Sequence, residues 1–262
     1  MKLVIFQFEP SWQEPQISLQ RLTEQFAKRF AMRLTEERSS SCLVVLPELF
    51  SSGFSMQPEK FAEAVDGEIS CHISQLAKDY HLEIIAGVAQ KQNQEFKNCA
   101  LWFDANGELK ANYQKQKMFR FADEHKVYRP GKKPVLASLF DYLQASLFIC
   151  YDLRFPELFR NVVKQSEIAV IIANWPQARQ MHWQILLQAR AIENQMWVLG
   201  VNRIGSDGND VLYSGGSMLF SPKGELVFDA KQSPVYEFDL NLQEMLGEVS
   251  TYRAEFPALE DL

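Results

Sequence analysis

Short apolar runs alternate along the first third of the chain with longer stretches that repeat their apolar residues every three or four positions. The runs KLVIFQF, CLVVLPE and EIIAGVAQ, all within residues 2–90, are typical of strands. Between the first two runs, Leu19, Leu22, Phe26 and Phe30 form one apolar stripe, and a similar stripe precedes the third run. The pattern predicts two amphipathic helices that pack against a sheet.

The rest of the chain adds hairpins and further buried strands. Two strand-like runs meet at Asn106-Gly107, a dipeptide that supplies the positive φ angles of a tight turn, and a second hairpin is expected around Pro222 to Gly224. The runs SLFICYD, IAVIIANW and MWVLGVN are typical of buried strands, with helical sequence in PELFRNVVK and HWQILLQARAIENQ. We therefore expect mixed sheets covered by helices.

Composition narrows the class of protein. The 262 residues, 47% of them hydrophobic, contain no linker-like segment, so we expect one domain over residues 1–262. With 33 acidic against 27 basic residues the net charge is −6, which argues against nucleic acid as a partner. The apolar run Ile168 to Ala173 is far shorter than the roughly 20 residues that span a bilayer. With no leader-like start, the sequence predicts a soluble cytoplasmic protein.

The cysteines show neither paired spacing nor histidines at ligand spacing, which excludes a zinc site and a disulfide framework as predictions. They are Cys42, Cys71, Cys99 and Cys150.

Three strand-like runs end on a chemically reactive side chain: Glu48, Lys115 and Cys150. Ligands bind in α/β folds at the carboxyl ends of strands, so the three side chains could converge. A thiol must lose its proton to act as a nucleophile; a glutamate can take that proton, and a lysine can stabilise a developing oxyanion. Individually each has a simpler explanation, as a core thiol, a helix N-cap partner or a solvated lysine.

A cysteine–histidine hydrolase is the competing mechanism. His72, His81 and His182 fall in expected helices, which leaves His125 as the candidate partner, and no protease-like motif surrounds the cysteine. The glutamate–lysine–cysteine arrangement is favoured.

The segments LPELF, YQKQKMF and CYDLRFPE, in this order, resemble the landmarks of the nitrilase, or carbon–nitrogen hydrolase, superfamily over essentially the whole chain. The resemblance implies an α/β fold, a four-layer α-β-β-α sandwich of two mixed sheets, commonly paired into a homodimer. It implies that Cys150 is the nucleophile, Glu48 the general base, and Lys115 the oxyanion partner together with the Tyr151 N–H. It also implies a second glutamate, Glu124, and no metal or organic cofactor.

Within the superfamily, NWP, HWQ and NRIGSDGN resemble the bacterial omega-amidase branch. That branch hydrolyses the terminal amide of short 2-oxo dicarboxylic acid monoamides such as 2-oxoglutaramate. A deaminated-glutathione amidase, an N-carbamoyl amino acid hydrolase, a nitrilase and a non-catalytic scaffold remain open. Such a substrate needs a partner for its remote carboxylate, because a buried unpaired charge is costly. The candidates for carboxylate binding or pocket walls are Arg154, Trp175, Phe119 and Tyr128.

One position departs from the family pattern. Many relatives have histidine two residues after the lysine, where this chain has Lys117. We expect an exposed lysine there rather than a substrate contact.

Overall fold

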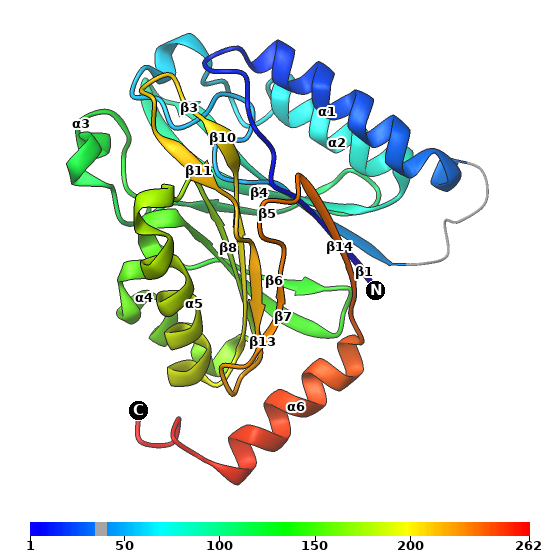
Figure 1. Cartoon of the computed structure of the whole chain (residues 1–262), viewed down its shortest axis with the longest axis vertical. Coiled ribbons are helices and arrows are strands. Elements are labelled where there is room, and N and C mark those ends of the chain that lie inside the picture. Colours follow the sequence, from blue (N-terminus) through cyan, green and yellow to red (C-terminus); the bar gives the residue numbers. More distant parts are fainter. Residues whose placement is uncertain (35–40) are drawn as a thin grey trace.

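Two six-stranded sheets lie face to face between layers of helices in the computed structural model, which describes residues 1–34 and 41–262 (Figure 1). This confirms the expected four-layer sandwich. The first sheet has the order β14-β1-β2-β3-β4-β5, formed by β14 (Val235–Asp239), β1 (Lys2–Phe6), β2 (Cys42–Val45), β3 (Glu83–Gln92), β4 (Glu95–Phe103) and β5 (Leu109–Gln114). Strands β1, β2 and β3 are parallel and their outer neighbours antiparallel, so the sheet is mixed.

The second sheet is mixed as well. Its order is β13-β12-β9-β8-β7-β6, formed by β13 (Leu226–Asp229), β12 (Met218–Phe220), β9 (Trp197–Asn202), β8 (Ile168–Ala173), β7 (Leu143–Ile149) and β6 (Leu136–Leu139). The parallel centre consists of β7, β8 and β9, the three buried runs read from the sequence. A small ribbon of β10 (Ile204–Ser206) and β11 (Leu212–Ser214) extends from β9.

The alternation of side chains in β1 explains why the first sheet is covered on both faces. Val4 and Phe6 pack under the two outer helices, whereas Leu3 and Ile5 face the second sheet. The outer helices are α1 (Pro15–Phe30) and α2 (Glu68–Tyr80), which lie side by side in Figure 1. The predicted stripe of α1 is buried in this contact, as the period of its apolar residues requires.

The core between the sheets is continuous with the core under the other helical layer. Trp102 from the first sheet and Phe148 from the second belong to this one cluster, which also contains Trp183 and Leu187 of α5 (Gln180–Asn194). The short α4 (Pro156–Arg160) and α5 cover the outer face of the second sheet (Figure 1). Helix α3 (Glu124–Val127) is a single turn, and α6 (Leu242–Glu255) follows β14. None of the helices in the described ranges is long and apolar enough to span a membrane.

Both predicted hairpins are present, as β4–β5 and β12–β13. The first differs in its turn. Only Gly107 has a positive φ, +80°, and its N–H donates to the Asp104 carbonyl, so the expected pair of positive φ angles is wrong. The Asp104 carboxylate accepts the Asn106 and Glu108 N–H groups, which holds Asn106 in ordinary backbone geometry.

Candidate active site

Glu48 lies three residues beyond Val45, the last residue of β2, where the chain passes very close to the neighbouring strand β3. A Cβ at Gly87 of β3 would lie 2.5 Å from the Glu48 Cα, so only glycine permits this approach. Hydrogen bonds between Gly87 and the backbone of Pro47 and Phe50 fix this approach. The Glu48 side chain is fully buried as a result.

Lys115 follows the last residue of β5 and is also fully buried. Its N–H donates to the Asn98 carbonyl of β4, which continues the strand pairing by one residue. The Nζ lies 2.8 Å from Glu48 Oε1, and 2.9 and 3.0 Å from the two carboxylate oxygens of Glu124. All three protons of the ammonium group therefore have carboxylate acceptors.

A fourth residue, Asn98, completes what we call the buried cluster: Glu48, Asn98, Lys115 and Glu124. The Asn98 Nδ2 donates to Glu48 Oε1 at 2.8 Å and to Glu124 Oε1 at 3.1 Å. The Glu124 Oε2 also accepts the Phe119 N–H at 2.6 Å. Both oxygens of Glu124 thus have two donors each, and this carboxylate has little capacity left for a further proton donor.

Glu48 is less heavily engaged and is joined to the second sheet. Its Oε2 accepts a hydrogen bond from the Asn174 N–H at 2.8 Å, and the Asn174 Nδ2 donates to the Glu48 carbonyl at 2.6 Å. Asn174 directly follows β8, so this pair connects the carboxyl end of a strand in each sheet. The second lone pair of Oε2 remains available to a proton donor.

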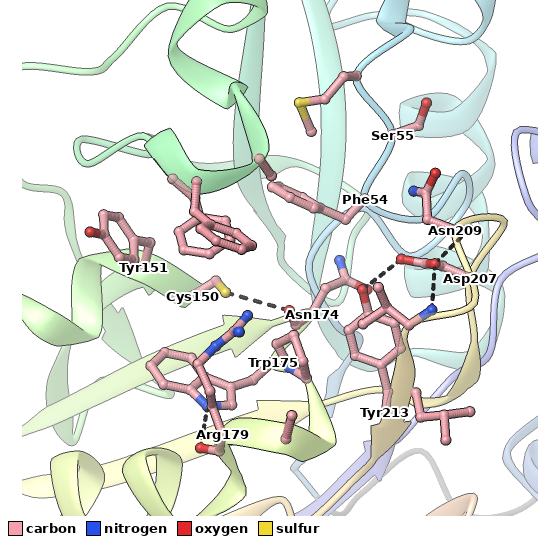
Figure 2. A pocket seen from close by; sticks show the side chains of 18 of the residues that line it. Phe54, Ser55, Cys150, Tyr151, Asn174, Trp175, Arg179, Asp207, Asn209 and Tyr213 are labelled. Carbon is pink, nitrogen blue, oxygen red and sulfur yellow. Dashed lines mark hydrogen bonds between the residues drawn. The ribbon is translucent and has the colours of Figure 1, made fainter.

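Cys150 follows β7 and begins a single 3₁₀ turn, Cys150–Arg154, that leads into α4. Its φ is +46°, a left-handed conformation that is strained for a non-glycine residue. The Sγ lies 3.7 Å from the Asn174 carbonyl oxygen, a hydrogen bond drawn in Figure 2. The cysteine is therefore held at the end of its strand, next to the residue that holds Glu48.

The Asp152 side chain stabilises this turn and connects it to the backbone that follows Lys115. Its buried carboxylate accepts the Ile149 N–H at 3.0 Å, the Lys117 N–H at 2.8 Å and the Tyr113 hydroxyl at 2.8 Å. The turn that begins at Cys150 and the backbone after Lys115 therefore share one acceptor. Burial raises the pKa of Asp152 to about 6, although the Lys115 charge and these donors favour the ionised form.

Charges in the cluster set the resting protonation state. Burial alone would lower the pKa of Lys115, but the Glu124 and Glu48 carboxylates outweigh it and raise that pKa well above its ordinary value. Burial, together with the Glu48 charge, raises the pKa of the Cys150 thiol well above its ordinary value, against the opposing effect of Lys115. The site at rest thus holds a charged lysine and a neutral thiol, which needs a base in order to react.

A cavity of about 1280 Å³ opens onto Cys150 and Lys115. Aromatic side chains form much of its wall: Phe119 packs on Tyr151 with ring centroids 5.0 Å apart, and Trp175 contributes from the turn after β8. Figure 2 shows Trp175 and Arg179 on one side of Asn174, and Asp207 and Tyr213 on the other. None of the four histidines, all of which are described, lines the cavity, so the cysteine–histidine alternative has no geometric support.

Two predicted wall residues have other surroundings than expected. Tyr128 does not line the cavity: it is fully buried beside Leu49 and Met118, and its hydroxyl donates to the Ser55 carbonyl at 3.0 Å. Arg154 does line the cavity, but its Nη2 lies 3.2 Å from His182 Nδ1 and it forms no ion pair with a carboxylate of the described residues.

Lys117, the position that departs from the family pattern, contacts residues at the start of α4. It forms an ion pair with Glu157 at 3.0 Å and lies over the Phe155 ring at 4.6 Å. It does not line the cavity.

No group of three or more histidine, cysteine, aspartate or glutamate side chains suited to a metal ion occurs within residues 1–34 and 41–262. The carboxylate oxygens of Glu124 and Asp152 already accept hydrogen bonds from protein donors.

A cysteine placed beside a carboxylate, an ammonium group and a large cavity, on a sandwich of two mixed sheets, defines a class of cysteine-dependent hydrolase. The chain belongs to the carbon-nitrogen hydrolase family, whose model matches residues 8–245. It is therefore an enzyme that hydrolyses carbon–nitrogen bonds.

Curated relatives and a solved structure lie within the same family. The chain is 37% identical over 219 residues to omega-amidase YafV of Escherichia coli (strain K12), covering 84% of this chain and 83% of that protein. It is 30% identical over 239 residues to 2-oxoglutaramate amidase of Bacillus subtilis (strain 168), covering 90% of each. The crystal structure of XC1258 from Xanthomonas campestris, a CN-hydrolase superfamily protein, superposes with a TM-score of 0.88 at 30% identity, covering 100% of this chain and 97% of that one.

Several residues at the site were missed by sequence reasoning. Asn174 ends a buried strand as Cys150 does, so the same strand-end rule would have found it. Asn98 is a fully buried polar residue next to the apolar run of β4. An amide in such a position needs hydrogen-bond partners, and this could have indicated a site residue. Asp152 carries no signal apart from its place in the nucleophile segment.

Proposed function

We propose that this protein is an omega-amidase that hydrolyses the terminal amide of short 2-oxo dicarboxylic acid monoamides, such as 2-oxoglutaramate and 2-oxosuccinamate, to the dicarboxylate and ammonia. The observation that carries this proposal is the position of Cys150 in a cavity shared with Lys115 and with two arginines, Arg154 and Arg179. The names of the relatives support the same substrate class.

In the acylation step, Glu48 takes the proton of the Cys150 thiol while Sγ attacks the amide carbon. The carbonyl π electrons move to oxygen, and Lys115 together with the Tyr151 N–H stabilises the resulting oxyanion. Tyr151 suits this role because it is the second residue of a 3₁₀ turn, where N–H groups have no partner within the turn. The intermediate collapses as Glu48 returns the proton to nitrogen, the C–N bond breaks and ammonia leaves a thioester.

In the deacylation step, Glu48 takes a proton from water and the hydroxide attacks the thioester carbon. The C–S bond breaks, the acid is released, and the thiolate recovers the proton from Glu48. We assign the proton transfers to Glu48 rather than Glu124 because Oε2 of Glu48 has one donor, whereas each oxygen of Glu124 has two. Glu124 and Asn98 keep Lys115 and Glu48 in place.

The remaining alternatives differ in what lies beyond the scissile bond. A deaminated-glutathione amidase, an N-carbamoyl amino acid hydrolase and a nitrilase would use the same nucleophile with a different substrate. A non-catalytic scaffold would have no requirement for the hydrogen bonds that Lys115, Asn98 and Asn174 direct at Glu48. The substrate therefore decides among the catalytic alternatives.

The test is ammonia release from 2-oxoglutaramate, deaminated glutathione, an N-carbamoyl amino acid and a simple nitrile. We expect 2-oxoglutaramate to give the highest kcat/KM, and Cys150→Ala to eliminate turnover without loss of circular dichroism. A higher kcat/KM on another member of the panel would replace the omega-amidase assignment. Turnover retained by the folded Cys150→Ala variant would overturn the mechanism.

We also propose a homodimer that pairs through α5. This helix exposes Met181, Ile185 and Ile192 by 66%, 54% and 48%, although such side chains are usually buried. Light scattering should give twice the mass of the chain, and Ile185→Glu should give the monomer. Ile17→Glu, at an exposed apolar residue of α1, is the matched control and should leave the dimer intact. A monomeric wild-type protein would contradict the proposal.

The cytoplasmic location expected from the sequence stays a prediction. Fractionation of cells that express the protein tests it, with a membrane or secreted fraction as the contrary result.

A further inference from the structure

The cavity that contains Cys150 is divided by charge. Arg154 and Arg179 line one part, and Asp207 and Asp210 line another. The Asp207 carboxylate is committed to its own loop, where it accepts the Asn209 N–H at 2.8 Å and the Tyr213 hydroxyl at 2.8 Å. A substrate with a carboxylate is repelled from the aspartate side and attracted to the arginine side, since opposite charges attract more strongly in a partly desolvated cavity.

The two arginines differ in their partners. The Arg154 guanidinium lies 4.9 Å above the Trp175 ring and contacts His182, so its position is fixed by protein groups. The Arg179 guanidinium lies 5.5 Å from the Phe119 ring centroid, and its side chain has no hydrogen bond to any of the described residues. Neither guanidinium forms an ion pair with a carboxylate of residues 1–34 or 41–262.

The backbone at Arg179 is nevertheless well fixed. It ends a 3₁₀ turn, Gln177–Arg179, directly before α5, and its carbonyl accepts the Trp175 Nε1 at 2.8 Å. A fixed backbone with an unpartnered guanidinium is suited to binding an anion, because the five N–H donors match a carboxylate in a two-pronged geometry. The side chain is half-buried against an aromatic ring, which limits its competing hydration.

We infer that Arg179 is the specificity-determining residue of this enzyme, and that its guanidinium binds the carboxylate of the substrate at the end remote from the scissile amide. Arg154 is a positioning residue, which supports the Trp175 wall. The inference rests on the proposed amidase function and goes beyond it by assigning the recognition of substrate charge to one side chain.

The test compares two amides that share a scissile group but differ at the remote end: 2-oxoglutaramate, and neutral pentanamide, which lacks the carboxylate and the 2-oxo group. Arg179→Gln should lower kcat/KM for 2-oxoglutaramate by about 10- to 150-fold, the value of one hydrogen-bonded charge. The loss should be mainly in KM, and kcat/KM for pentanamide should change by less than about threefold. Arg154→Gln should lower kcat/KM for both substrates by similar factors.

Arg120→Gln is the matched control. Arg120 lies between Phe119 and Phe121, which line the cavity, but it does not line the cavity itself, so the substitution removes a nearby charge without removing a contact. We expect no change in the ratio of the two kcat/KM values. The inference would be overturned if wild type and Arg179→Gln gave the same ratio of the two kcat/KM values. It would also be overturned if that ratio fell with Arg154→Gln or Arg120→Gln instead. Either result would leave the amidase function intact. Absence of ammonia release from every amide by the wild-type enzyme would overturn both.

Discussion

The bottom of the active-site cavity and its rim are built differently. At the bottom, the buried cluster and Asn174 are at most 4% exposed, and hydrogen bonds between their side chains and backbone connect the two sheets. All of them follow or belong to strands except Glu124, which begins α3. The rim consists of turns and a short hairpin, and it carries exposed apolar side chains such as Phe121 and Leu212, which are 86% and 59% exposed.

We therefore assign the reaction to the bottom of the cavity and the selection of the substrate to its rim. A buried, multiply connected cluster tolerates little change, because removing one partner leaves another charge or polar group unpaired. The rim can change its side chains without disturbing the cluster, which allows one family to use the same bond chemistry on different substrates. Substitutions at the bottom should therefore act mainly on kcat, and substitutions at the rim on KM.

The largest effect is expected for Glu48→Gln. The amide keeps the shape of the side chain but cannot take the thiol proton, so kcat should fall by about 10⁴-fold. Steady-state ammonia release measures the loss, and intact-protein mass spectrometry should show no accumulated thioester. A kcat within tenfold of the wild-type value would show that another group is the base.

Glu124→Gln should have a smaller effect, about 10²-fold in kcat, because this carboxylate holds Lys115 without exchanging protons with the substrate. Comparing Glu48→Gln with Glu124→Gln tests whether the number of hydrogen-bond donors on each carboxylate identifies the base. If Glu124→Gln is the more damaging of the two at equal folded content, the assignment should be reversed.

Asp152→Asn should reduce kcat by about 10- to 100-fold, since an amide cannot accept from every donor around it. Wild-type activity should fall as pH decreases through about 6, where protonation of Asp152 removes an acceptor from the nucleophile turn. In the variant, this inflection should be missing from the rate profile. An unchanged profile would remove Asp152 from the positioning network.

The effect of Asp152 on stability should have the opposite sign. Its pKa in the folded state is raised to about 6 from 3.8, so its contribution to the unfolding free energy is greatest below pH 4. That contribution, about 3 kcal/mol, is lost as pH rises to about 6. Urea unfolding of wild type and Asp152→Asn at both pH values measures it.

The smallest effect is expected outside the cavity, beyond both the cluster and the rim. Lys117→Gln breaks an exposed ion pair with Glu157, which should cost no more than about 0.5 kcal/mol in unfolding free energy. Because Lys117 lies outside the cavity, kcat and KM should both remain within about twofold of wild type. A large loss of activity would mean that the boundary of the rim is drawn incorrectly.

Sequence patterns predicted most of the fold because hydrophobic periodicity reports which face of an element is buried. The stripe of α1 and the three apolar runs of β7, β8 and β9 are examples. The turn at Asn106-Gly107 was predicted in place but not in geometry, because the Asp104 side chain decides which residue takes the positive φ.

The site was predicted where a reactive side chain ends a strand, as for Glu48, Lys115 and Cys150. The same rule marks Asn174 as a candidate site residue, but it could not predict that Asn174 bonds to Glu48, because the sequence does not report how two sheets align. The position of the Tyr128 side chain could not be predicted either, since a tyrosine near a loop can face a cavity or, as here, pack in the core.

The hydrogen bonds from Asn174 to Glu48 have a consequence for measurements on the intact molecule. With Glu48 as the proposed base and Cys150 as the proposed nucleophile, turnover depends on how the two β-sheets are aligned, because Glu48 follows a strand of one sheet and Cys150 a strand of the other. A small slip between the sheets would misalign the reacting atoms while leaving every strand ladder intact. In increasing denaturant, catalytic activity should therefore disappear before the circular dichroism signal of the strands.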